Sequence, residues 1–297
     1  MFTTFNQCLQ QSKENLLNPN PSFATKGWVP YPGHNLLHKD YGWSRSDLHS
    51  LIKEASSLSE FVHAFFERPL KYSGALIWVE KTPSNAYSFS HFLDLFPDAK
   101  VIHVTRNPYD TVASLVRRGL TPFFAAGMWI YNTASALKVE GSERYLAIRY
   151  EDFVENPEGE ITRLLNFINA NVDLSIIEPL QNEASDTAIQ TWINRPNQKI
   201  SKTSIGSFDR LGESTKREII TALSLFRISD RHMNINGFLY SNCFEICQKI
   251  GYDFEQKVFA NCVRKIRADC IKDILRRSLR LYPTGLRNYP AKLLRSL

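Results

Sequence analysis

Short apolar runs that alternate with helical segments constrain the fold of this chain more than any other feature. Three runs are predicted to be buried strands: ALIWVE (75–80), KVIHVT (100–105) and RYLAIR (144–149). Helical periodicity or Pro near a first turn predicts helices over 46–66 and 84–96, from 107–108, and over 121–137, 157–168, 216–226 and 241–250. Strands that alternate with helices predict an α/β fold, a parallel sheet covered on both faces.

The chain of 297 residues is long enough for one large α/β domain plus an appendage. Its charge is uneven, because residues 257–297 hold 11 of the 36 Lys and Arg and only 2 of the 30 Asp and Glu. A helix is expected over 254–281, where Val258, Cys262, Ile266, Cys270 and Ile274 form an i, i+4 row. We therefore predict a domain over 1–255 and a basic amphipathic tail over 256–297.

The composition excludes several classes of protein. No stretch reaches the ~18 apolar residues of a membrane span, and no signal peptide is recognisable in MFTTFNQCLQQSKEN. Five cysteines without a CxxC pair indicate reduced thiols in a cytoplasmic protein and no metal site.

The segment KVIHVTRNPYDTVASLVRRG predicts an anion site. Arg106 follows a buried strand, and a helix begins two residues later, where ligands bind in parallel sheets and where N–H groups are free. Ser114 and Arg118 lie further along the same helix. In the alternative interpretation, Arg106 belongs to a structural ion pair and Ser114 packs within the helix.

The segment WVEKTPSN adds a second cation, because Lys81 ends the strand predicted before that of Arg106. The carboxyl ends of parallel strands share one edge of a sheet, so Lys81 is expected near the phosphate pocket. The alternative is a surface lysine in a strand-to-helix turn.

Four strings make the chain resemble the sulfotransferase family, in particular its tyrosylprotein and carbohydrate branch. They are EKTPSN…FPDAKVIHVTRNPYDTVAS, RYEDFVENPEGEITRLLNFI, QKISKTSIGSF and NCFEICQKIGYDF. The resemblance runs from about residue 75 to residue 254. It implies a three-layer P-loop-type fold and the sulfate donor PAPS (3′-phosphoadenosine 5′-phosphosulfate).

The resemblance also implies roles for individual residues. Arg106, Ser114 and Arg118 match the family's ligands of the 3′-phosphate, and Tyr150 matches a tyrosine near the adenine. Lys81 matches the lysine that stabilises the transferring sulfuryl group. Lys202 and Ser204 match contacts on a late loop that closes over the nucleotide.

The family's first strand and most of its P-loop, a P-[RK]-[ST]-G-T-T stretch for the 5′-phosphosulfate, have no complete counterpart here. Thr3 and Thr4, followed by Leu9, fit the end of that loop, so the chain is expected to start inside it. A truncated gene model and a genuine fragment remain alternatives, as does a chance match.

The acceptor base is expected in KGWVPYPGHNLLHKDYGW. His34 is the first candidate because imidazole titrates near neutral pH, with His38 and Asp40 as alternatives. His103, within a predicted strand, is expected to be a packed core residue.

The predicted function is transfer of a sulfuryl group from PAPS to a hydroxyl of a carbohydrate, lipid or protein tyrosine. The alternative is a non-catalytic protein of the same fold that acts in binding or assembly. The basic tail is expected to dock on the domain and to touch anionic membrane surfaces peripherally. No nucleic-acid partner is expected. The acceptor and the oligomeric state are not predicted.

Overall fold

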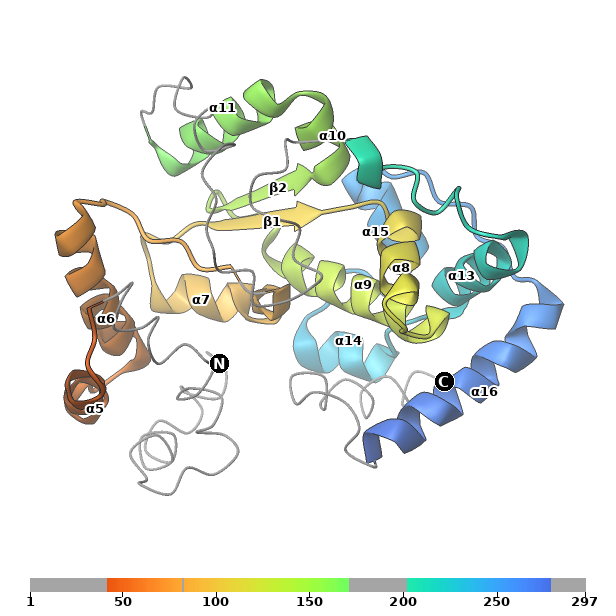
Figure 1. Ribbon diagram of the computed structural model, residues 1–297, viewed down its shortest axis with the longest axis horizontal. Coiled ribbons are helices and arrows are strands. Elements are labelled where there is room, and N and C mark those ends of the chain that lie inside the picture. Colours follow the sequence, from red (N-terminus) through yellow and green to blue (C-terminus); the bar gives the residue numbers. More distant parts are fainter. Residues whose placement is uncertain (1–41, 82, 171–201, 279–297) are drawn as a thin grey trace. The chain divides into compact units, whose positions relative to one another are not determined.

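The computed structural model describes residues 42–81, 83–170 and 202–278 of the chain (Figure 1). The chain divides into two compact units, Met1–Ala99 and Lys100–Leu297. Each unit is described by itself.

The first unit is helical in the part that the structure describes. It contains α5 (Arg45–Glu54), α6 (Leu58–Ser73), a 3-10 helix (Pro83–Ser88) and α7 (Phe89–Leu95). The single helix expected over 46–66 is therefore wrong. The break has a local cause, because the Ser57 side chain accepts a hydrogen bond from the Glu60 N–H at 3.1 Å and starts a new helix there.

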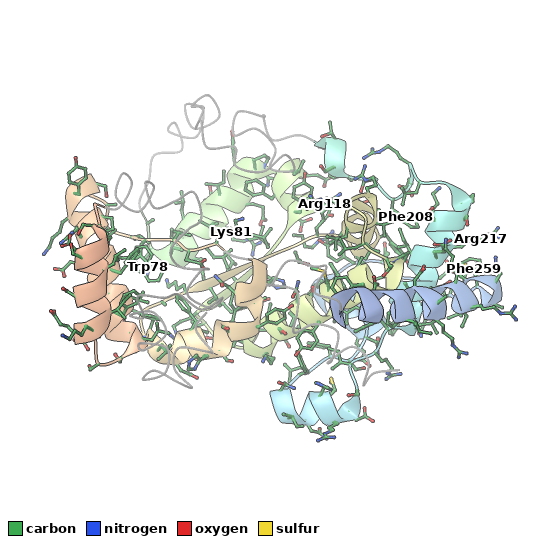
Figure 2. The ribbon with its side chains drawn as sticks, turned by 60° about the horizontal axis from the view of Figure 1, so that its bottom comes forward. Trp78, Lys81, Arg118, Phe208, Arg217 and Phe259 are labelled. Atoms are coloured by element: carbon green, nitrogen blue, oxygen red, sulfur yellow. The ribbon has the colours of Figure 1, made fainter. Side chains whose placement is uncertain are left out.

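The strand expected over 75–80 is also wrong, because this segment runs without strand pairing. Its apolar side chains are exposed, with Leu76 at 94% and Val79 at 82%. Trp78 is the exception, since its ring stacks on Phe66 with the ring centroids 4.3 Å apart (Figure 2). A short apolar run becomes a strand only where a neighbouring strand takes up its backbone hydrogen bonds, and the described part of the first unit offers none.

The second unit contains the sheet. Strands β1 (Val101–Thr105) and β2 (Tyr145–Arg149) pair in parallel, with Val101 opposite Tyr145 and Thr105 opposite Arg149. The parallel sheet and the predicted positions of these two strands are confirmed. In Figure 1 the strands point the same way, with α9 (Pro122–Ala136) beneath β1 and α11 (Pro157–Ile168) beyond β2.

Helix α9 lies in the core of this unit. Small side chains let neighbouring helices approach it closely, and all but three of its fifteen residues are buried. The helices that surround it are α8 (Pro108–Arg117), α13 (Glu213–Leu225), α15 (Cys243–Ile250) and α16 (Ala260–Ser278). The remaining helices are α10 (Tyr150–Glu155), α14 (Asp230–Asn236) and 3-10 turns at Leu137–Val139 and Lys202–Ser204.

Helix α16 packs into the core of the second unit through three residues of the predicted apolar row. Cys262, Ile266 and Cys270 are buried in the same cluster as Trp129 of α9. Val258, the first residue of that row, precedes the helix and is 47% exposed. The basic side chains on the outer face include Arg264 and Arg267, both exposed.

An ion pair and a hydrogen bond also join α16 to its neighbours. Lys265 pairs with Glu218 of α13 at 2.5 Å, and Thr121 donates a hydrogen bond to Asp273. Phe259 directly precedes α16, and the Arg217 guanidinium of α13 lies 5.4 Å from its ring centroid (Figure 2). Within residues 42–81, 83–170 and 202–278, no helix combines the length and apolarity that crossing a membrane requires.

Candidate functional site

Arg106 lies at the carboxyl end of β1, immediately before α8. A core residue anchors its backbone, because the Trp129 indole N–H donates to the Arg106 carbonyl at 2.9 Å. Its guanidinium Nη2 donates to the carbonyl of Ser204 and, at 3.1 Å, to the hydroxyl of Ser207. The same nitrogen lies 3.6 Å from a carboxylate oxygen of Asp110, and the side chain is 21% exposed.

The N-terminus of α8 does not offer the free N–H groups expected from the sequence. Asn107 caps the helix, and its side-chain oxygen accepts from the N–H groups of Tyr109 at 2.9 Å and Asp110 at 3.4 Å. Pro108 has no N–H, and the Thr111 N–H donates to the Asn107 carbonyl. The expectation of free N–H groups at this helix start is therefore wrong, and the guanidinium of Arg106 is the cationic group at this position.

The buried carboxylate of Asp110 binds the segment 204–208, which lies about a hundred residues away in sequence. It accepts hydrogen bonds from the Gly206 N–H at 2.9 Å, the Phe208 N–H at 2.8 Å and the Ser207 hydroxyl at 3.1 Å. These bonds bring the late-loop residues to Arg106.

Tyr150 begins α10 at the carboxyl end of β2, next to the end of β1. The guanidinium carbon of Arg106 lies 5.3 Å from the centroid of its ring, within cation–π range. The ring therefore forms one wall beside the guanidinium.

Glu151 connects the two strand ends. Its carboxylate accepts from the Asn107 N–H at 3.0 Å and from the Tyr252 hydroxyl at 2.6 Å. Burial, reinforced by the hydrogen bond to Glu151, raises the pKa of Tyr252. Arg149 also contacts Tyr252, with its guanidinium 4.6 Å from the centroid of the Tyr252 ring.

The other ligands predicted in the second unit differ in their contacts with Arg106. Ser114 is half-buried on α8, and no hydrogen bond of its hydroxyl is found in the described ranges. Arg118, labelled in Figure 2, is the exposed C-cap residue of α8, whereas Arg106 precedes the N-cap of that helix. Ser204 meets Arg106 through its carbonyl rather than its hydroxyl, and Lys202 is exposed at the start of the same turn.

Four predicted residues lie in the first unit or outside the described residues. Lys81 is an exposed residue of the first unit and precedes the 3-10 helix Pro83–Ser88. Thr3, Thr4 and His34 lie outside the described residues.

His103 is packed in the core, as expected. It is 8% exposed, and its Nδ1 lies 2.8 Å from the Tyr145 hydroxyl. Burial lowers the pKa of His103 to about 4, so the imidazole is neutral.

Unused hydrogen-bonding capacity remains at the end of β1. The Nε of Arg106 and the hydroxyl of Thr105 are buried, and neither has a hydrogen-bond partner in the described part of the chain. Buried donors are normally satisfied, and a guanidinium suits phosphate oxygens. These residues fit a phosphate group.

No group of three or more metal-binding side chains occurs among the described residues.

Sequence reasoning missed four residues that build this centre: Asp110, Trp129, Glu151 and Tyr252. Only Asp110 carried a usable signal, since an acid four residues after an arginine on a helix start suggests an ion pair. The other three act across long sequence separations.

Two solved structures share the α/β fold of this chain. One solved structure with this fold is a sulfotransferase domain from the curacin biosynthetic pathway, with 18% identity and a TM-score of 0.52 over 82% of this chain and 85% of that chain. Another is a sulfotransferase domain from the Synechococcus PCC 7002 olefin synthase, with 16% identity and a TM-score of 0.51 over 82% of each chain.

A model of the sulfotransferase family matches residues 34–173, which include β1, β2, Arg106 and Tyr150. Over these residues the chain is similar to the sulfotransferase family. The resemblance read from the sequence and the α/β fold are confirmed.

Proposed function

We propose that the protein transfers a sulfuryl group from PAPS to a hydroxyl of a carbohydrate, lipid or protein tyrosine. The observation that carries the proposal is the placement of Arg106. Its guanidinium lies at the end of a parallel strand, beside the ring of Tyr150, and has a buried donor for which the described residues offer no acceptor. A cation with a planar fork beside an aromatic wall suits a phosphorylated nucleoside.

In this proposal the residues of the second unit bind the nucleotide part of the donor. Arg106 holds the 3′-phosphate, helped by Ser114 and Arg118. The ring of Tyr150 lies against the adenine, and Lys202 and Ser204 contact the nucleotide from the late loop.

The residues assigned to chemistry are proposed from the sequence motifs. Thr3 and Thr4 hold the 5′-phosphosulfate end. The ammonium of Lys81 stabilises the charge that develops as the S–O bond to the leaving phosphate breaks. His34 accepts the proton of the acceptor hydroxyl while its oxygen forms the new S–O bond. Bound PAPS supplies the activated sulfuryl group.

The test is sulfuryl transfer by the full chain from radiolabelled PAPS to three acceptors: a carbohydrate, a lipid alcohol and a tyrosine peptide. We expect label on one of them. Lys81→Ala should lower kcat by about 100-fold or more, as removal of a group that stabilises developing charge does. Lys71→Ala, which removes an exposed lysine paired with Glu67, is the matched control and should change kcat little.

The rival function is non-catalytic binding by a protein of the same fold. The ion pair of Arg106 with Asp110 and the capped start of α8 favour it, since both are satisfied without a ligand. Absence of transfer to every acceptor, together with absence of nucleotide binding, would contradict the transferase proposal and leave the rival standing.

A cytoplasmic location is part of the proposal. It is supported by four free thiols among the described residues, of which Cys243 and Cys247 lie 3.7 Å apart at sulfur without a disulfide. Thiol titration of the protein purified from the cell without reductant should recover these cysteines as reactive thiols after denaturation.

A further inference from the structure

We propose that Asp110 is a positioning residue that seats the segment Ser204–Phe208 against Arg106 and thereby prepares the site for the nucleotide. This inference rests on the proposed function for its binding readout, while the seating itself is measurable without nucleotide.

The carboxylate of Asp110 receives three hydrogen bonds from this one segment. One oxygen accepts from the Gly206 N–H at 2.9 Å, and the other accepts from the Phe208 N–H at 2.8 Å and the Ser207 hydroxyl at 3.1 Å. Both oxygens therefore face donors of this segment. The group is 5% exposed, so these bonds replace the water it loses on burial.

The backbone of the segment is shaped for this contact. Gly206 has a φ of +69°, in the left-handed region that side chains rarely adopt. An aromatic contact fixes the end of the segment, with the ring centroids of Phe208 and Tyr109 4.9 Å apart. Tyr109 and Asp110 both lie in the first turn of α8, so one rigid element holds the segment at two points.

The segment in turn orients Arg106. The guanidinium Nη2 donates to the Ser204 carbonyl and the Ser207 hydroxyl, which belong to the same stretch that Asp110 binds. Removal of the carboxylate therefore frees the segment and, with it, the guanidinium.

The direction in which phosphate affinity changes when Asp110 is neutralised distinguishes this positioning role from a purely electrostatic one. Asp110 carries negative charge 3.6 Å from Arg106, so Coulomb repulsion alone predicts that its neutralisation strengthens binding of a phosphate. A seating role predicts the opposite, because the amide of Asn would present N–H groups to one of the backbone N–H donors.

The test compares Asp110→Asn with the wild type and uses adenosine 3′,5′-bisphosphate (PAP) as the probe. We expect affinity to fall at least about tenfold in Asp110→Asn, as loss of a hydrogen-bonded charge predicts. In the Arg106→Ala background the same change should have no further effect. Ser207→Ala, which removes one of the three bonds, should fall between. Asp152→Asn, an acid of α10 that is 47% exposed, is the control and should bind as the wild type does.

Amide hydrogen exchange without nucleotide is the second readout. Exchange at Gly206 and Phe208 should rise at least about tenfold in Asp110→Asn and remain unchanged in Asp152→Asn. Unchanged protection, or unchanged or tighter PAP binding in Asp110→Asn, would overturn the inference. If the wild type binds no PAP, the proposed function fails, and the exchange at Gly206 and Phe208 alone decides whether Asp110 seats the segment.

Discussion

The hydroxyl of Tyr252 donates a 2.6 Å hydrogen bond to the carboxylate of Glu151, which lies 101 residues earlier in the chain. The other oxygen of this carboxylate accepts from the Asn107 N–H. Glu151 follows Tyr150, and Asn107 follows Arg106. The contact therefore fixes the relative positions of the two site residues at the ends of β1 and β2.

Tyr252→Phe removes the hydroxyl and leaves the Glu151 carboxylate with one of its two partners. We expect the free energy of unfolding to fall by about 1–3 kcal/mol, the cost of an unmade bond to a charged acceptor. Tyr72→Phe, at a side chain 95% exposed, should leave it unchanged. Urea denaturation of the two variants measures the difference, and equal midpoints would show that the bond contributes nothing.

His103 predicts a pH dependence of stability. Burial lowers its pKa from an ordinary 6.5 to about 4, so the unfolded chain binds one more proton than the folded chain between these values. Stability contributed by the neutral imidazole is complete above pH 6.5 and is lost as the pH falls towards 4, by up to about 3 kcal/mol.

His103→Gln removes this titration and keeps a polar partner for the Tyr145 hydroxyl. The slope of unfolding free energy against pH should be shallower in the variant between pH 4 and 6.5 and equal above pH 7. Parallel curves over the whole range would contradict the buried, neutral imidazole.

Asn107→Ala removes the cap of α8. The N–H groups of Tyr109 and Asp110 lose their acceptor, so the protein should lose about 1 kcal/mol of stability. Asn107→Asp keeps an acceptor at the same place and should retain most of the stability that the cap contributes. Thermal denaturation distinguishes the two variants, and equal losses would argue against capping by this side chain.

Helix α16 gives a prediction about the basic tail. Ile266→Ala opens a cavity in the core of the second unit and should cost about 2–5 kcal/mol. Arg264→Gln with Arg267→Gln changes only exposed side chains and should alter stability by less than about 0.5 kcal/mol.

The expected contact with anionic lipid stays a prediction. Deletion of the tail would remove core residues, so the double glutamine variant is the proper test. It should bind phosphatidylserine vesicles more weakly than the wild type in a sedimentation assay. Equal sedimentation would remove the lipid interpretation of these arginines.

The sequence predicted the elements whose signals are local. Asn107-Pro108, Thr121-Pro122 and Pro157 each stand at the start of a helix in the structure. The short apolar runs at 100–105 and 144–149 form the paired strands. These signals need no knowledge of distant residues.

The predicted elements were wrong where hydrogen-bond partners decide which secondary structure a segment adopts. An apolar run at 75–80 predicted a buried strand, yet Leu76 and Val79 are exposed in a segment without strand pairing. The cap at Ser57 overrode a continuous apolar periodicity and divided one expected helix into two. The short polar helix α14 carried no apolar stripe and was not expected.

The sequence predicted which residues belong to the site better than it predicted the contacts that hold them together. Arg106, Tyr150 and Ser204 do lie together, but Asp110 and Glu151 assemble them through bonds that span about a hundred residues of chain. Spacing along a sequence does not reveal such bonds.

Calorimetric titration of the full chain with PAP tests the central claim most directly, with Arg106→Ala and the exposed-residue control Arg264→Ala in parallel. We predict binding by the wild type and by Arg264→Ala, and affinity at least about 30-fold weaker in Arg106→Ala. Equal binding by all three proteins, or no binding by any, would contradict a nucleotide site at Arg106.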